Sequence, residues 1–265
     1  MTAVAVTIAG SDSAGGAGIQ ADLKTFSALK VYGASIITAL TAQNTRGIAA
    51  VHDVPASFVA LQVDAVFSDL KVGAVKIGML SKPDVIEAVA SGLDRHRQRS
   101  VVLDPVMVAT SGTRLIDPEA VDLLRRTLIP RARIITPNLP EAAALLGAGM
   151  ARSEAEMRLQ AERLLGLGAG AVLLKGGHGT GAESIDVFVD GTAELRLPAP
   201  RMATRNTHGT GCTLSAAIAA GLAKGLPLAE AVQEGKIYVT AAIAAADQLS
   251  IGSGPGPLHH FFTWW

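Results

Sequence analysis

Short runs of β-branched residues alternate along this chain with longer segments rich in alanine and leucine. This alternation is typical of β-α-β units that build a mostly parallel sheet. It predicts strands at residues 4–8, 35–38, 74–77, 101–103, 133–136 and 171–174, and helices at residues 18–29, 55–69, 82–95, 118–126, 139–146, 154–167, 211–223 and 228–248. Asp190 and Gly191, between apolar runs at 185–189 and 193–197, predict an antiparallel hairpin at one edge.

Length and charge favour one globular α/β domain spanning residues 1–265. The 265 residues, 49% of them hydrophobic, suffice for a sizeable core, and we find no dividing linker or internal repeat. Lysine plus arginine and aspartate plus glutamate both number 23, so no basic excess favours a nucleic acid partner.

The single cysteine and the apolar runs bear on the compartment. One cysteine excludes an intramolecular disulfide and a cysteine-rich metal site, which favours a reducing cytoplasm. The N-terminus lacks a basic leader, and charged or turn residues interrupt every apolar run before the roughly 20 residues that a membrane helix needs. We therefore expect a cytoplasmic protein without a membrane partner.

Residues 206–220, NTHGTGCTLSAAIAA, place Gly209, Gly211 and Cys212 directly before an alanine-rich helical segment. The glycines permit backbone angles that let successive amides point one way, into the positive end of the helix. Such a turn is suited to an anion, and phosphate is the expected ligand.

Polar residues gather after each predicted strand, where ligands bind in open parallel sheets. They are Gly10, Ser11, Asp12, Gly15, Gly16, Gly18 and Asp22 after the first strand, Gln43, Asn44 and Thr45 after the second, Gly78 and Met79 after the third, Asp104 and Pro105 after the fourth, Asn138 and Glu141 after the fifth, and Lys175, Gly176, Gly177 and His178 after the sixth. Singly, several of them are common turn or cap residues. Their convergence favours a binding site, although neither a complete dinucleotide fingerprint nor a P-loop occurs.

With these blocks in place, the chain resembles the ribokinase-like superfamily, and within it the hydroxymethylpyrimidine/phosphomethylpyrimidine kinases of thiamin biosynthesis. The resemblance rests on residues 9–22 (AGSDSAGGAGIQAD), 38–45 (TALTAQNT), 76–80 (KIGML), 104–112 (DPVMVATSG), 136–141 (TPNLPE), 175–178 (KGGH) and the turn GTGC at 209–212. Cys212 is the strongest subfamily marker, because similar sugar kinases carry an aspartate there. The family implies a three-layer α/β/α sandwich with a mostly parallel central sheet and a homodimer.

The resemblance also implies residue roles. It places the pyrimidine against Gly10, Asp22, Gln43, Met79 and Val106, with Cys212 near the hydroxymethyl group. It places ATP and Mg²⁺ against Asp104, Asn138, Glu141, Lys175 and Thr207, with Glu141 and Asp104 as metal ligands. Core packing explains Met79 and Val106 equally well, and a helix N-terminal charge is the alternative for Glu141.

For phosphoryl transfer we expect the amides of Gly209, Thr210, Gly211 and Cys212 to hold the migrating phosphate while Lys175 and Mg²⁺ neutralise charge. The helix N-terminus is expected to lower the Cys212 pKa, so that a thiolate could take the hydroxyl proton. A small residue that fits a tight helix start is the alternative. A further hypothesis is that cysteine avoids repelling a substrate that already carries a phosphate.

Three other functions are open from the sequence: a pyridoxal kinase, a non-catalytic pyrimidine-binding module, and a cysteine hydrolase. The last lacks an evident histidine and acid partnership. Outside the site, residues 252–257 (GSGPGP) predict a surface loop, His208 is interpreted as structural, and Lys30 stands where the family leads us to expect glycine.

Overall fold

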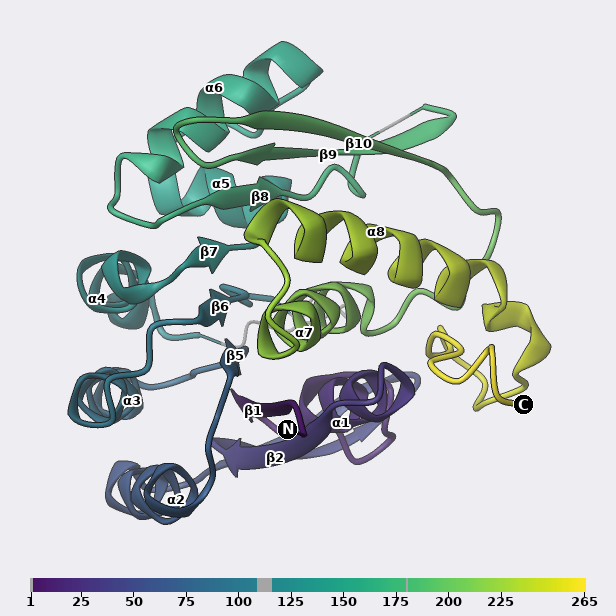
Figure 1. The fold of residues 1–265 in the computed structure, drawn as a ribbon. Helices are drawn as coiled ribbons and strands as arrows, with labels where there is room; N and C mark the ends of the chain where they lie inside the picture. The colour runs from purple at the N-terminus through teal and green to yellow at the C-terminus, as the bar shows by residue number, and fades with distance from the viewer. Residues whose placement is uncertain (1, 109–115, 180) are drawn as a thin grey trace.

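The computed structural model describes residues 2–108, 116–179 and 181–265. Part of the motif at 104–112 therefore lies outside the described residues. Figure 1 shows a central sheet between two layers of helices, the three-layer α/β/α sandwich that the resemblance implied.

In the described chain the sheet runs in the order β10-β9-β8-β7-β6-β5-β1-β2, with a separate two-stranded sheet β3-β4. The strands are β1 (Val4–Ala9), β2 (Tyr32–Ile37), β3 (Ala39–Asn44), β4 (Gly47–Asp53), β5 (Ala74–Ile77), β6 (Val101–Leu103), β7 (Ile134–Ile135), β8 (Val172–Leu174), β9 (Glu183–Val189) and β10 (Glu194–Pro200). From β8 to β2 the strands pair in parallel, and β9 and β10 form the predicted antiparallel edge hairpin.

The bounds of most helices agree with the predicted ranges to within a few residues. They are α1 (Gly18–Ala28), α2 (Ala56–Asp69), α3 (Pro83–Arg95), α4 (Pro118–Thr127), α5 (Leu139–Leu146), α6 (Glu154–Leu165), α7 (Thr210–Ala223) and α8 (Leu228–Ala244). The predicted last helix extended to residue 248, but residues 246–248 form a 3-10 turn.

The prediction was wrong in the region of β2 to β4. It placed one strand at 35–38, followed by the polar residues Gln43, Asn44 and Thr45, whereas β2 begins at Tyr32 and β3 follows after one residue. β3 and β4 form a hairpin, and the break in its register lies between Ala42 and Gln43. Gln43 therefore belongs to a strand of the small sheet and not to a loop.

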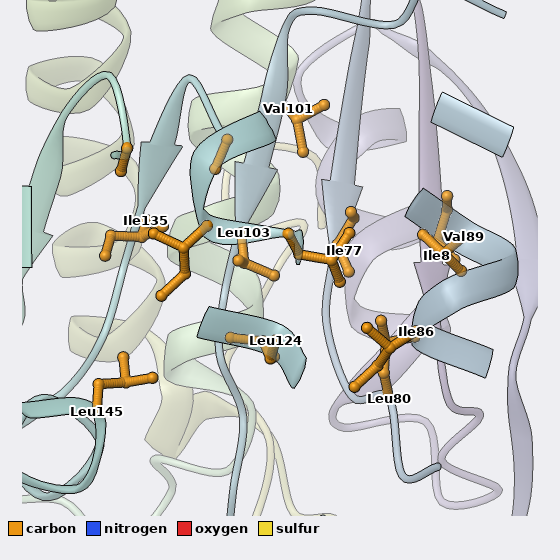
Figure 2. Packing of buried hydrophobic residues seen from close by; sticks show 14 of the residues in the cluster. Ile8, Ile77, Leu80, Ile86, Val89, Val101, Leu103, Leu124, Ile135 and Leu145 are labelled. Atoms are coloured by element: carbon orange, nitrogen blue, oxygen red, sulfur yellow. The ribbon is translucent and has the colours of Figure 1, made fainter. Parts of the chain in front are cut away.

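Two hydrophobic clusters cover the two faces of the large sheet. The larger packs α2 to α6 against alternating strand residues such as Ile8, Ile77 and Leu103 (Figure 2). The other packs α1, α7 and α8 against the opposite face, where Ala5 and Ala74 leave room for α7. α7 lies close to the sheet because its segment from Thr213 to Leu222 is buried and rich in alanine.

The C-terminal segment packs against the body more closely than predicted. Residues 251–253 are exposed, as expected for a surface loop, but Gly256 and Pro257 are buried. Further along, Trp264 lies under the Lys30 ammonium, 5.6 Å from the ring centroid. Lys30 has a φ of 61°, the left-handed conformation that explains the expected glycine at this position.

Candidate active site

Five neighbouring parallel strands carry a polar residue at or near their carboxyl ends, on the same face of the sheet. Each follows by two positions a residue of the α7-side cluster: Thr7 after Ala5, Lys76 after Ala74, Asp104 after Val102, Thr136 after Ile134, and Lys175 after Leu173. Because strand side chains alternate between faces, the polar members point toward α7, as the apolar ones do. A row of charged and hydroxyl groups therefore lies at the carboxyl ends of the strands.

The glycine turn at the start of α7 lies over this row. Gly209 is the N-cap of α7 with a φ of 83°, and a Cβ there would collide with the Gly16 carbonyl oxygen. A Cβ on Gly211 would stand 3.1 Å from the Lys175 ammonium. Gly209 is thus required by close backbone approach and by its positive φ, whereas Gly211 leaves the helix N-terminus facing the Lys175 side chain.

Lys175 and Asp104 form the ion pair nearest to the turn. Lys175 Nζ donates to Asp104 Oδ1 at 2.7 Å, and Thr136 Oγ1 donates to the same oxygen at 3.1 Å. Burial lowers the pKa of Lys175, but Asp104 and Glu141 outweigh it and raise the pKa above its ordinary value. Lys175 is therefore a fixed positive charge beside the turn.

Lys76 and Asp22 form a second ion pair, with both side chains fully buried. Lys76 Nζ donates to Asp22 Oδ2 at 2.8 Å, and Thr7 Oγ1 donates to the same oxygen at 2.6 Å. The structure differs here from the expected site, because Asp22 is enclosed behind Lys76 and does not line the cavity described below. Asp22 serves as the counter-ion of Lys76, and a direct contact with a bound ring is not part of this geometry.

Asn138 and Glu141 are joined by a capping box at the start of α5. The Asn138 side-chain oxygen accepts from the backbone N–H of Glu141, and the Glu141 carboxylate accepts from the backbone N–H of Asn138, both at 2.8 Å. Burial raises the pKa of Glu141 to about 7, while the Lys175 charge opposes the shift. Glu141 therefore caps α5 in this structure and also lines the cavity, and its role as a metal ligand stays a prediction.

The donor set fits Mg²⁺ only in part. Asp104 Oδ1 is already held by Lys175 and Thr136. In the described part of the chain, no group of three or more histidine, cysteine, aspartate or glutamate side chains could hold a metal ion. Mg²⁺ commonly keeps several waters and binds through one or two carboxylates together with substrate phosphates. Glu141 fits that pattern, with most ligands coming from a bound nucleotide.

Cys212 occupies the first turn of α7 and is half-buried at the cavity wall. Burial raises its pKa to about 11, although the positive charge of Lys76 opposes the shift. The expected lowering by the helix N-terminus was therefore wrong, because desolvation by the surrounding protein outweighs it. Cys212 is a thiol at neutral pH.

One cavity of about 740 Å³ brings these groups together. Its lining includes the predicted residues Gly10, Gln43, Met79, Val106, Asp104, Asn138, Glu141, Lys175, Thr207, Gly209, Thr210, Gly211 and Cys212. The same cavity is lined by Asp12, which was among the converging polar residues predicted from the sequence, and by Lys76, His208, Asp186 and Lys236, for which no site role was predicted. A lysine within the apolar strand at 74–77 was a usable signal for Lys76, whereas Lys236 in a long helix gave none.

Lys236 and Asp186 form a third buried pair at the β9 side of the cavity. Lys236 Nζ donates to Asp186 Oδ2 at 2.7 Å, and the Gly176 amide donates to Asp186 Oδ1 at 2.9 Å. The pair thus holds the backbone just after Lys175, between the strand ends and α8.

The C-terminal segment supports the turn from behind. The His208 amide donates to the Gly256 carbonyl oxygen at 3.1 Å, and Thr213 Oγ1 lies 3.0 Å from His260 Nε2. Burial lowers the pKa of His260 to about 4, so this imidazole is neutral at physiological pH. The turn is held between the glycine-rich loop at 10–18 and the C-terminal segment.

A helix N-terminus that faces a lysine and a carboxylate, at the carboxyl edge of a sheet with this strand order, defines a small-molecule kinase of the ribokinase-like class. The model of one family, phosphomethylpyrimidine kinase, matches residues 12–259. The chain therefore belongs to the phosphomethylpyrimidine kinase family.

Individual relatives agree with this assignment. The chain is 64% identical over 265 residues to a hydroxymethylpyrimidine/phosphomethylpyrimidine kinase of Rhizobium meliloti, covering 100% of this chain and 99% of that protein. It is 54% identical to a thiamine biosynthesis bifunctional protein of Geobacter sulfurreducens, covering 97% of this chain and 52% of that protein. A Bacillus subtilis pyridoxal kinase in complex with ADP superposes with a TM-score of 0.91 at 37% identity, covering 98% of each chain.

Proposed function

We propose that this enzyme transfers the γ-phosphate of ATP to the hydroxymethyl group of 4-amino-5-hydroxymethyl-2-methylpyrimidine, and then phosphorylates the monophosphate to the diphosphate. These are steps of thiamine biosynthesis, the process that names the Geobacter sulfurreducens relative. The observation that carries the proposal is a single cavity shared by the anion turn, Lys175 and the residues expected around the pyrimidine.

In this proposal Gly10, Gln43, Met79 and Val106 surround the pyrimidine. A side-chain amide can pair with the adjacent donors and acceptors of an aminopyrimidine edge, while methionine and valine cover the ring. The amides from Gly209 to Cys212 bind the migrating phosphate, since the first turn of a helix leaves amide groups without intrahelical partners. Asp22 acts from behind, through Lys76.

Lys175, Asp104, Asn138 and Thr207 lie on the side that we assign to the nucleotide. Fixed positive charge favours the charge spread over the transferring phosphoryl group. Glu141 would hold Mg²⁺, directly or through water, and the ion would neutralise phosphate charge. Binding of the ion would require Glu141 to lose its proton.

A protonated Cys212 thiol is a poor general base. The proposal does not need one, because a loose phosphoryl-transfer transition state depends mainly on positioning and charge stabilisation. We propose instead that cysteine keeps negative charge away from the second substrate, which already carries a phosphate. In the Cys212→Asp variant, the second transfer should fall more than the first. Equal loss in both steps would contradict the charge argument.

The test of the proposed activity measures ADP release from Mg²⁺-ATP with three acceptors: the hydroxymethylpyrimidine, its monophosphate, and pyridoxal. Turnover of both pyrimidines supports the proposal, and turnover of pyridoxal alone would replace it with the rival kinase. The rival has one specific observation in its favour, the close superposition on the Bacillus subtilis pyridoxal kinase. Binding without ADP release would indicate a non-catalytic module.

We also propose that the chain is a single domain and forms a homodimer in the cytoplasm. The sheet edge at β2 and the adjoining β3, β4 and α2 expose large apolar side chains: Tyr32, Leu40, Val51, Phe58 and Leu61. Exposed apolar patches commonly mark protein contacts. Light scattering of the wild type should give twice the monomer mass, and Leu61→Glu should reduce it.

No helix in the described residues is both long and apolar enough to cross a membrane.

A further inference from the structure

Three polar side chains from distant parts of the chain meet in the wall of the cavity. His208 Nε2 lies 2.9 Å from Asp12 Oδ2 and 3.3 Å from the Gln43 atom assigned as the amide nitrogen, Nε2. His208 belongs to the anion turn, Asp12 to the glycine-rich loop and Gln43 to β3. The cluster thus links the turn that would bind phosphate to the Gln43 side-chain amide that would hydrogen-bond the pyrimidine.

Both carboxylate oxygens of Asp12 accept hydrogen bonds from backbone amides. Its Oδ1 accepts from the Ala14 amide at 2.9 Å, and its Oδ2 accepts from the amides of Gly16 and Ala17 at 3.0 and 2.9 Å. A carboxylate that receives three amide hydrogen bonds is held in its ionised form, which only accepts. The contact at 2.9 Å therefore requires a proton on His208 Nε2.

That proton determines the orientation of the Gln43 amide. A protonated Nε2 donates and cannot accept, so the Gln43 atom that faces it must be the amide oxygen. The oxygen and nitrogen of a side-chain amide are assigned from the groups around them. Exchanging the two atoms at Gln43 places its oxygen toward His208, where the Nε2 proton meets an acceptor and not a second donor.

Thr41 completes the network at the other end of the amide. Its hydroxyl can donate to the Ser11 carbonyl oxygen at 2.8 Å or to Gln43 Oε1 at 3.1 Å, and the single hydroxyl proton satisfies the shorter contact with Ser11. The Thr41 oxygen can then accept from the Gln43 NH₂ group. Thr41 is therefore compatible with the orientation of Gln43 that His208 imposes.

We infer that His208 is a specificity-determining positioning residue, which holds the Gln43 amide in one orientation and thereby selects the aminopyrimidine edge over the pyrimidinone edge. This inference rests on the proposed function. An aminopyrimidine offers an amino donor beside a ring-nitrogen acceptor. The corresponding pyrimidinone offers a carbonyl acceptor beside an N–H donor. An amide free to turn by 180° could pair with either, whereas a fixed one pairs with only one.

The test compares His208→Met with the matched variant His208→Gln. Both replacements have similar length, but only glutamine retains an N–H donor at the end of the side chain. Steady-state kcat/KM is measured on the aminopyrimidine and on its 4-oxo analogue, with circular dichroism as a control for folding. We expect His208→Met to reduce the preference for the aminopyrimidine by about 10-fold or more, with partial rescue in His208→Gln.

A loss of the same factor on both substrates, with the preference unchanged, would overturn the inference and leave His208 a structural brace. A second measurement uses the folded wild type and stands even if the methionine variant does not fold or no pyrimidine is phosphorylated. In ¹⁵N-labelled protein the His208 Nε2 should carry a proton. An unprotonated Nε2 would overturn the inference independently of any activity.

Discussion

Two lysine–aspartate pairs flank the first turn of α7, and they differ in what surrounds them. Lys76 and Asp22 are both fully buried, whereas the Lys175 side chain retains 12% of its exposure at the cavity. Asp22 is shut off from the cavity, while Asp104 and Lys175 both line it. The comparison teaches that two similar pairs beside the same turn differ in role: the Lys76–Asp22 pair, which borders the cavity only through Lys76, maintains the fold under the site, and the Lys175–Asp104 pair is available to a ligand.

The largest effect is expected for Lys175→Met. Loss of the fixed positive charge beside the turn should lower kcat by about 10³-fold, the range found when a preorganised charge-stabilising group is removed. The melting temperature should fall less than in Lys76→Met, because Asp104 borders the cavity, where water can reach it, and keeps Thr136 as a donor. Steady-state kinetics and thermal melts measure both quantities. A variant with near-normal kcat would break the comparison.

The enclosed pair should show the opposite balance. Lys76→Met leaves Asp22 buried without its counter-ion, so the free energy of unfolding should fall by roughly 3 kcal/mol. The double variant Lys76→Met/Asp22→Leu should recover most of that loss, because an apolar pair can replace a buried ion pair. Urea unfolding measures each step. Full stability in the single variant, with activity lost as in Lys175→Met, would refute the division of work.

Glu141 adds a pH dependence to the open side of the site. Its pKa of about 7 in the folded protein lies above its ordinary value of 4.5, so the folded state favours the protonated form. The associated stability is complete below pH 4.5 and is lost as the pH rises through 7. Without Mg²⁺, the unfolding free energy relative to Glu141→Gln should fall by about 3 kcal/mol between pH 4 and 8. Parallel curves for both proteins would contradict this account.

The smallest effect concerns the thiol that lies between the pairs. Because burial raises the Cys212 pKa to about 11, alkylation by iodoacetamide should remain slow up to pH 9 in the folded protein. The denatured protein, with an ordinary pKa of 9.0, serves as the control. A folded-state midpoint below 8 would restore the thiolate, and with it a base role for Cys212.

The sequence predicted the large sheet, its edge hairpin and a set of site residues of which all but Asp22 line the cavity. Alternating strand and helix signals are local, and the polar residues follow the strands directly, so position along the chain sufficed. β3 was missed because its residues alternate weakly and it follows β2 after a single residue. The burial of Asp22, which lies in α1, depends on Lys76 and Thr7 from two strands, and no local pattern in the sequence predicts these contacts.

The same limit explains the error at Cys212. The helix N-terminus is visible in the sequence and argues for a lowered pKa, but the desolvation that outweighs it comes from the surrounding fold. His208 is a similar case, because its partners Asp12 and Gln43 lie 196 and 165 residues away. Pairwise geometry across the cavity is what the sequence lacked.

The most direct test of a single two-step transfer site is a ³¹P NMR time course with Mg²⁺-ATP and the hydroxymethylpyrimidine. The wild type should form the monophosphate and then the diphosphate, and Lys175→Met should lose both transfers by similar factors. No phosphorylated pyrimidine from the wild type, or a Lys175→Met variant that loses only one transfer, would contradict the account.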